Sequence, residues 1–135
     1  INKLPRLFGI QAEACAPLHA AYQAGMEDIL PISTSPTIAE GIMLARPIRA
    51  KQILRAIRAS MGGTVSVSEN EIKESMQRLG KRGFFVEPTS AVAVAGLTRL
   101  TKSGTVGPTE VTVVVLTGSG LKSVSTIGKL LNLRE

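Results

Sequence analysis

Residues 110–116 read EVTVVVL, and the loop TGSG of residues 117–120 follows directly. An almost continuous β-branched run of this kind is typical of a central parallel strand that is covered on both faces. Shorter apolar segments at residues 7–12, 64–67 and 84–86 are predicted as further strands. Because helical patterns separate these strands, the sequence predicts a three-layer α/β/α fold with a mostly parallel sheet of about four strands.

The predicted helices have recognisable ends. Pro17 suits a first helical turn, Gly25 suits a helix terminus, and Ser68 and Glu71 have the S-x-x-E spacing of a capping box. The segment 90–100 consists largely of Ala, Val, Gly and Leu, and a helix with so little polarity is expected to be buried. Helices are predicted at residues 17–25, 48–61, 68–80 and 90–100, with a brief one at 37–44.

The size and composition fit one domain. The chain has 135 residues, 44% of them hydrophobic, and residues 1–135 are expected to form a single α/β unit. The only cysteine, Cys15, cannot form an internal disulfide, and the start of the chain does not resemble a secretion signal, so a reducing cytoplasmic setting is expected. No apolar run approaches the ~20 residues that cross a bilayer, and no membrane partner is predicted.

Reactive side chains are scarce. The chain has one His (His19), one Asp (Asp28) and one Cys, and their positions do not favour a Ser-His-Asp triad. Cys and His do not occur at metal-ligand spacing, so no metal site is predicted. His19 and Cys15 are interpreted as packing residues.

The chain is basic, with a formal net charge of +6. Aromatic residues make up only 3% of it and Trp is absent, so base stacking has little support and no nucleic-acid partner is predicted. One basic run, without an acidic residue between Gly41 and Ser68, is either a solvated face or a surface that binds a partner or nucleic acid. Its members are Arg46, Arg49, Lys51, Arg55 and Arg58.

The segment 117–123, TGSGLKS, matches neither common phosphate-binding motif. A P-loop needs four residues between its glycines and a Gly directly before Lys, whereas one residue separates Gly118 from Gly120 and Leu121 precedes Lys122. The dinucleotide fingerprint fails because Ser123 occupies the position of its third Gly. Two interpretations remain, a tight turn after a strand or a turn whose amides and Thr117 hydroxyl face a ligand cleft.

Glu87 precedes Pro88 and the apolar helix. Its carboxylate lies either near a cleft at the carboxyl end of a strand or in solvent, where a helix N-terminus favours negative charge.

Four motifs in order resemble one enzyme family. The chain is similar to the carboxyl-terminal portion of threonine synthase, one of the tryptophan-synthase-like pyridoxal-phosphate (PLP) enzymes, and the similarity covers nearly the whole chain. The motifs are FGIQAE (8–13), PTIAEGI (36–42), VEPTSA (86–91) and LTGSGLK (116–122).

The resemblance implies that the cofactor is pyridoxal 5'-phosphate and that Thr117 donates a hydrogen bond to its pyridine nitrogen. A neutral hydroxyl does not keep this nitrogen protonated, which moderates the ring as an electron sink. Gly118 and Ser119 correspond to the turn beside the ring, and Glu87 corresponds to the family's glutamate near it.

The resemblance also implies what the chain lacks. The family's cofactor-binding lysine and glycine-rich phosphate loop lie upstream of all four motifs, and Lys122 does not match the lysine motif. We therefore expect a missing amino-terminal half, no catalytic residue in this chain, and a fragment that is inactive alone and does not retain PLP. The start at Ile1 fits a piece of a longer chain.

Two alternatives remain open. The motif PTIAEG at residues 36–41 resembles serine/threonine dehydratases, whereas the TGSGLK ending resembles threonine synthase. The chain could instead be a non-catalytic interaction module that uses its basic surface. A truncated parallel sheet exposes a strand edge, so a homo-oligomer is expected.

Overall fold

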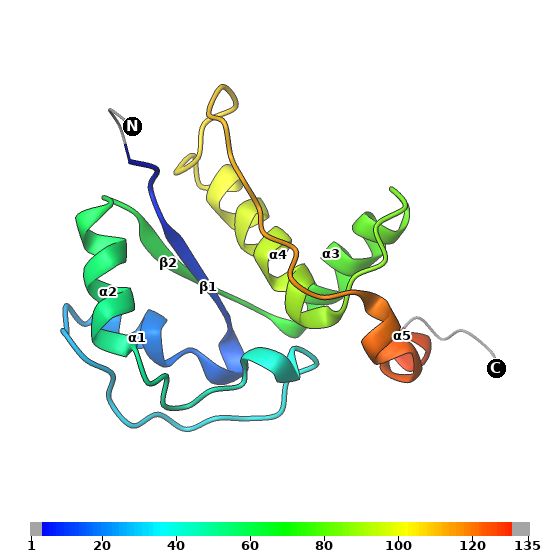
Figure 1. Ribbon diagram of the computed structural model, residues 1–135, viewed down its shortest axis with the longest axis horizontal. Coiled ribbons are helices and arrows are strands. Elements are labelled where there is room, and N and C mark those ends of the chain that lie inside the picture. The colour runs from blue at the N-terminus through cyan, green and yellow to red at the C-terminus, as the bar shows by residue number, and fades with distance from the viewer. Residues whose placement is uncertain (1–3, 131–135) are drawn as a thin grey trace.

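The computed structural model describes residues 4–130 as a mixed α/β fold (Figure 1). The two strands are β1 (Phe8–Ala12) and β2 (Gly63–Val67). The α-helices are α1 (Pro17–Gln23), α2 (Ala50–Ala59), α3 (Glu69–Gly80), α4 (Pro88–Lys102) and α5 (Val124–Leu130). Short 3-10 helices are η1 (Glu13–Cys15), η2 (Glu40–Ile42) and η3 (Gly120–Ser123).

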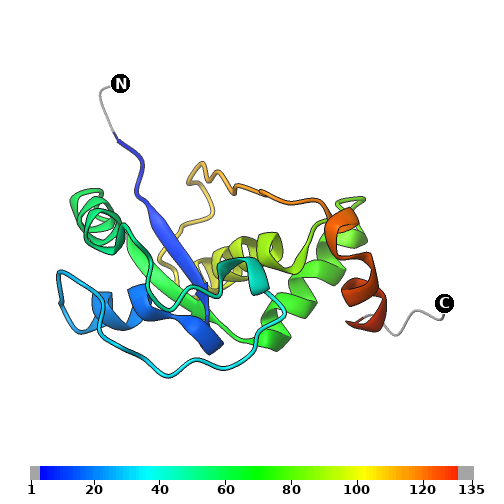
Figure 2. The ribbon, with the colours of Figure 1, turned by 60° about the horizontal axis from the view of Figure 1, so that its bottom comes forward.

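β1 and β2 form a two-stranded parallel sheet in which Phe8 is opposite Gly63 and Ala12 is opposite Val67. Helices cover both faces. α1 and α2 lie on one side of the strands, and α4 with α3 lies on the other (Figures 1 and 2). The predicted three-layer α/β/α arrangement is therefore confirmed. None of the helices in the described range 4–130 is long and apolar enough to span a membrane.

The predicted helix ends are largely confirmed. Pro17 occupies the first turn of α1, and Gly25 follows that helix with a φ of 70°, a conformation that glycine adopts readily. At α3 the capping box forms, because Ser68 Oγ accepts from the Glu71 N–H and Glu71 Oε2 accepts from the Ser68 N–H. The brief helix predicted at 37–44 is reduced to η2.

The prediction of about four strands is wrong for the part of the chain that the structure describes. In the segment 84–86, Val86 forms only an isolated antiparallel bridge with Ser119. Residues 111–118 belong to no strand, and Val111, Val113 and Val115 are 98%, 83% and 67% exposed. β-branched residues favour a strand only where a neighbouring strand and a covering layer exist, and among the described residues nothing pairs with this run.

The core lies mainly between the sheet, α3 and α4. Its buried side chains include Ala12, Val67, Ile72, Met76, Leu79, Ala91, Val92 and Ala95. Gly96 lets α4 approach β1 closely, since a Cβ at this position would lie 2.5 Å from Ile10 Cδ1. This contact fixes α4 on the sheet and thereby sets the position of its first turn.

Candidate functional site

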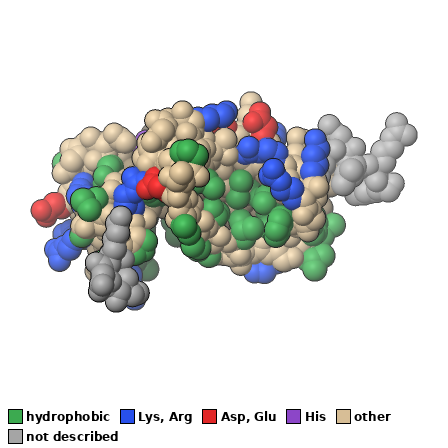
Figure 3. Space-filling model, turned by 90° about the horizontal axis from the view of Figure 1, so that it is seen from above, with side chains coloured by type: hydrophobic (Ala, Val, Ile, Leu, Met, Phe, Trp, Pro, Cys, Tyr) green, Lys and Arg blue, Asp and Glu red, His purple; other side chains and the backbone are tan. Residues whose placement is uncertain are grey.

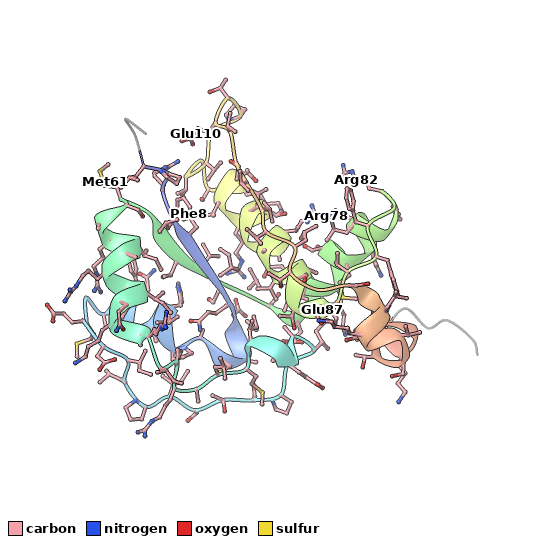
Figure 4. All side chains as sticks on the ribbon, in the orientation of Figure 1. Phe8, Met61, Arg78, Arg82, Glu87 and Glu110 are labelled. Carbon is pink, nitrogen blue, oxygen red and sulfur yellow. The ribbon has the colours of Figure 1, made fainter. Side chains whose placement is uncertain are left out.

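The candidate site lies at the end of the molecule where both strands finish. β1 ends at Ala12 and β2 at Val67, and α4 begins at this same end, with Glu87 as its N-cap residue (Figures 1 and 4). Ligands of open α/β sheets bind beyond the carboxyl ends of the strands. The first turn of α4 is therefore in the expected place for a ligand site.

The turn at 117–120 packs against the chain that leads into α4. Glu87 donates its backbone N–H to Gly118 O at 3.2 Å, and Gly120 donates its N–H to Phe85 O at 3.0 Å. Together with the bridge from Val86 to Ser119, these bonds join segments that lie far apart in the sequence. The four predicted cofactor-binding residues, Glu87, Thr117, Gly118 and Ser119, are thus brought together.

Gly118 has a steric role in this arrangement. Gly118 is buried, and a Cβ added to it would collide with the Glu87 carboxylate. Glycine therefore allows the turn to lie directly against Glu87. The neighbouring Ser119 is exposed, and its Oγ accepts the Leu121 N–H at 3.3 Å, so it caps η3.

Thr117 is exposed, and its Oγ1 lies 3.4 Å from Ser90 Oγ. The residue is therefore exposed while its hydroxyl lies within hydrogen-bond distance of Ser90. Such a group can donate a hydrogen bond to a ligand atom that approaches from solvent.

Ser90 is a site residue to which sequence reasoning assigned no role. It is only 2% exposed, and its Oγ accepts the Gly118 N–H at 2.7 Å. The sequence signal for Ser90 is a hydroxyl at the start of a helix whose segment 90–97 is otherwise apolar. Because buried hydroxyls are normally hydrogen-bonded, such a residue indicates a partner elsewhere in the fold.

The loop before η2 is fixed at the same end of the molecule. Glu69 accepts the Thr37 hydroxyl at 2.6 Å and the Ile38 N–H at 2.9 Å, while Thr89 Oγ1 accepts the Gly41 N–H at 3.3 Å. The motif 36–42 therefore contacts the first turns of α3 and α4. Glu69 and Thr89 were not predicted as site residues, since their partners lie far away in sequence.

An ion-pair cluster joins α4 to neighbouring elements. The Arg99 guanidinium contacts Glu71 and Glu13. Hydrogen bonds from the Arg99 side chain lower the pKa of Glu71 from 4.5 to about 2, with further lowering by Ser68 and opposition from desolvation. The hydrogen bond to Glu71 likewise raises the pKa of Arg99. This cluster stabilises the helix that carries the site.

The remaining predicted polar residues lie elsewhere. Of the basic run, Lys51, Arg55 and Arg58 line a hollow of about 280 Å³ beside α2, on the opposite side of the sheet from α4. His19 Nδ1 lies 3.0 Å from Thr64 Oγ1, and Cys15 is buried, as expected of packing residues.

A second hollow, of about 430 Å³, adjoins the site without containing its polar groups. It lies between α3, residues 84–86 and α5, and neither Thr117 nor Glu87 lines it. We therefore place the candidate site at the turn and not in this apolar hollow.

Residues 1–118 match the family described as "Pyridoxal-phosphate dependent enzyme". The chain belongs to this family. It is 39% identical over 123 residues to the threonine synthase of Methanocaldococcus jannaschii and 38% identical over 127 residues to that of Methanosarcina acetivorans. These alignments cover 90% and 93% of the chain but only 30% and 31% of the two relatives. The predicted resemblance to threonine synthase is confirmed.

Solved structures agree with the fold. The crystal structure of threonine synthase from Escherichia coli superposes with a TM-score of 0.75 at 17% identity, covering 96% of this chain and 29% of that one. The crystal structure of a threonine deaminase from T.th. gives a TM-score of 0.57 at 27% identity, covering 75% of this chain and 35% of that one.

The described residues fit one edge of the family's cofactor. A pyridine nitrogen is a hydrogen-bond acceptor, and the hydroxyl of the exposed residue Thr117 is a neutral donor of the kind that it needs. Gly118 beside Thr117 contributes no side chain of its own, and the Glu87 carboxylate lies against it. A neutral donor next to this turn is compatible with the edge of a planar ring.

Proposed function

We propose that this chain is the carboxyl-terminal part of a PLP-dependent enzyme of the threonine synthase type, which converts O-phosphohomoserine and water to threonine and phosphate. The observation that carries the proposal is the exposed Thr117 on a turn that is hydrogen-bonded to the first turn of α4. The similarity to threonine synthases over nine-tenths of the chain supports it.

In this proposal the chain supplies the pyridine-nitrogen side of the cofactor site. Thr117 donates a hydrogen bond to the ring nitrogen, Gly118 and Ser119 form the turn beside the ring, and the Glu87 carboxylate lies against that turn. When bound, PLP supplies an electron sink for the reaction. Because Thr117 is neutral, the site leaves the ring nitrogen unprotonated, and the ring then withdraws electrons less strongly.

We propose that the cofactor-binding lysine and the phosphate-binding loop belong to polypeptide upstream of Ile1. The chain spans about 30% of the length of the M. jannaschii relative, which leaves room for such a half. The isolated chain is then expected to be inactive and not to retain PLP. We further propose that the intact enzyme is a cytoplasmic homo-oligomer, a setting in which the free thiol of Cys15 stays reduced.

A serine/threonine dehydratase is the second candidate. The motif PTIAEG at residues 36–41 favours it, as does the similarity to the T.th. threonine deaminase. Both candidates use the same cofactor and the same side of the site. They differ in the bond that is broken and hence in the products.

Product analysis of the full-length protein, loaded with PLP, distinguishes the two candidates. With O-phosphohomoserine, the proposed reaction releases phosphate and threonine in equal amounts. Release of ammonia and an oxo acid from threonine or serine, without turnover of O-phosphohomoserine, would instead establish the dehydratase.

A further inference from the structure

Ser90 is a buried polar residue that bonds directly to the turn of the proposed site, and the capping and packing of α4 leave its role unexplained. It lies in the first turn of the helix, next to the core residues Ala91 and Val92, and is 2% exposed. Serine hydroxyls inside helices often bond to the carbonyl one turn earlier. Within residues 4–130, Ser90 Oγ instead hydrogen-bonds to the turn at 117–118.

These contacts restrict the Ser90 proton. Ser90 Oγ accepts the Gly118 N–H at 2.7 Å, and its own O–H faces two acceptors, Gly118 O at 3.3 Å and Thr117 Oγ1 at 3.4 Å. A hydroxyl has one proton to donate. Either hydroxyl can be the donor between Ser90 and Thr117. When Ser90 donates to Thr117, the Thr117 proton is free for another acceptor, so an acceptor placed beside Thr117 favours this arrangement.

We propose that Ser90 is a positioning residue for the PLP site, which fixes the turn through Gly118 and directs the Thr117 proton toward the cofactor's ring nitrogen. The inference rests on the proposed function, because it assumes that this nitrogen meets Thr117. Ser90 itself does not touch the cofactor and acts only through Thr117 and Gly118.

The turn depends on Ser90 because, among the described residues, the other restraints reach neither the Gly118 N–H nor the Thr117 hydroxyl. The backbone hydrogen bonds from Glu87 N–H to Gly118 O and from Gly120 N–H to Phe85 O fix the backbone conformation of the turn. Only Ser90 receives the Gly118 N–H and reaches the Thr117 hydroxyl among the described contacts. Removal of Ser90 Oγ should therefore let the Thr117 hydroxyl rotate, while the backbone conformation of the turn at 117–120 is retained.

The test compares Ser90→Ala with Ser90→Thr in the full-length protein. In Ser90→Ala without cofactor, the Gly118 amide should exchange its hydrogen at least about tenfold faster, because it loses its acceptor. After PLP is added, the absorbance maximum of the bound cofactor should shift, and kcat should fall about 10- to 100-fold with little change in KM. Ser90→Thr retains the hydroxyl and should restore the spectrum.

Ser75→Ala is the matched control, since Ser75 is also buried, at 1% exposure, but lies in α3 and accepts a hydrogen bond from Arg78. It should leave the cofactor spectrum and kcat at wild-type values. If Ser90→Ala does not fold, the near-isosteric Ser90→Cys replaces it with the same expected spectral shift.

A wild-type cofactor spectrum and kcat in folded Ser90→Ala or Ser90→Cys would overturn the inference and leave the proposed function standing. Failure of the wild-type protein itself to bind PLP would instead overturn the proposed function. The two failures are therefore distinguishable.

Discussion

The Arg99 guanidinium holds both carboxylate oxygens of Glu71, with Nε 2.6 Å from Oε1 and Nη2 2.8 Å from Oε2. The same Nη2 lies 3.0 Å from Glu13 Oε1, just beyond β1. Since Glu71 also completes the capping box of α3, one arginine ties α4 to the start of α3 and to the end of β1. Bidentate geometry of this kind is stronger than a single surface ion pair.

The first prediction concerns acid stability. The folded-state pKa of Glu71 is about 2, below its ordinary value of 4.5, so its contribution is complete above pH 4.5 and is lost as the pH falls toward 2. With allowance for screening by water, Glu71→Gln should lower the free energy of unfolding by about 1–2 kcal/mol at pH 7 and by much less near pH 2.

Urea unfolding at both pH values measures this effect. Glu74→Gln is the control, because Glu74 is exposed on the same helix, and it should change stability little at either pH. An equal loss of stability for Glu71→Gln at pH 7 and pH 2 would contradict the assignment of the pKa shift to folded-state contacts.

The second prediction concerns the glycine of the turn. Gly118→Ala would force its Cβ into the Glu87 carboxylate, so the turn must move away from α4. The expected cost is about 1–3 kcal/mol of folding free energy. Gly80→Ala is the control, since a Cβ there meets nothing within 4 Å, and it should be neutral or slightly stabilising. Thermal unfolding of the two variants tests this prediction. Equal unfolding midpoints for Gly118→Ala and Gly80→Ala would contradict the close packing of Gly118 against Glu87.

The third prediction separates binding from folding at Thr117. Because this residue is exposed, Thr117→Val should change the free energy of unfolding by less than about 0.5 kcal/mol. In the full-length protein it should weaken PLP binding about tenfold, whereas Thr117→Ser should bind PLP normally. Fluorescence titration with PLP measures the affinities. Wild-type affinity in Thr117→Val would remove Thr117 from the cofactor site.

The fourth prediction concerns self-association of the isolated chain. Figure 3 shows hydrophobic side chains gathered on the half of the molecule that carries α3, α4 and α5, and the exposed Val111, Val113 and Val115 follow α4. An unpaired β-branched run is a template for association. Light scattering should therefore detect oligomers that grow with concentration.

Val113→Lys combined with Val115→Lys should reduce this association. Ile48→Lys, which removes another fully exposed hydrophobic side chain, should leave it unchanged. A monomer at high concentration in the unsubstituted chain would show that residues 111–116 do not act as a pairing edge.

Local signals predicted local structure well. The capping box at Ser68 and Glu71 fixes the start of α3, and Pro17 and Gly25 mark α1, because each depends on residues within a few positions. The strand predicted at 110–116 failed, since a strand needs a neighbour that the sequence pattern does not specify. Its composition suits a buried sheet, whereas the structure leaves it exposed.

The same limit applies to the site. The motifs identified Glu87, Thr117, Gly118 and Ser119 as site residues. They assigned no role to Ser90, which lies in the motif 86–91 but whose partner Gly118 is 28 positions away. Contacts at this range depend on how α4 packs on the sheet through Gly96 and Ile10. They follow from the tertiary fold and not from any local pattern.

The most direct test of the account is an experimental structure of the full-length protein with PLP bound. We expect the Thr117 hydroxyl within hydrogen-bond distance of the pyridine nitrogen, about 2.7–3.2 Å, with Gly118 still bonded to Ser90. A cofactor whose ring nitrogen faces another side chain, or that is bound away from the turn at 117–119, would contradict the account.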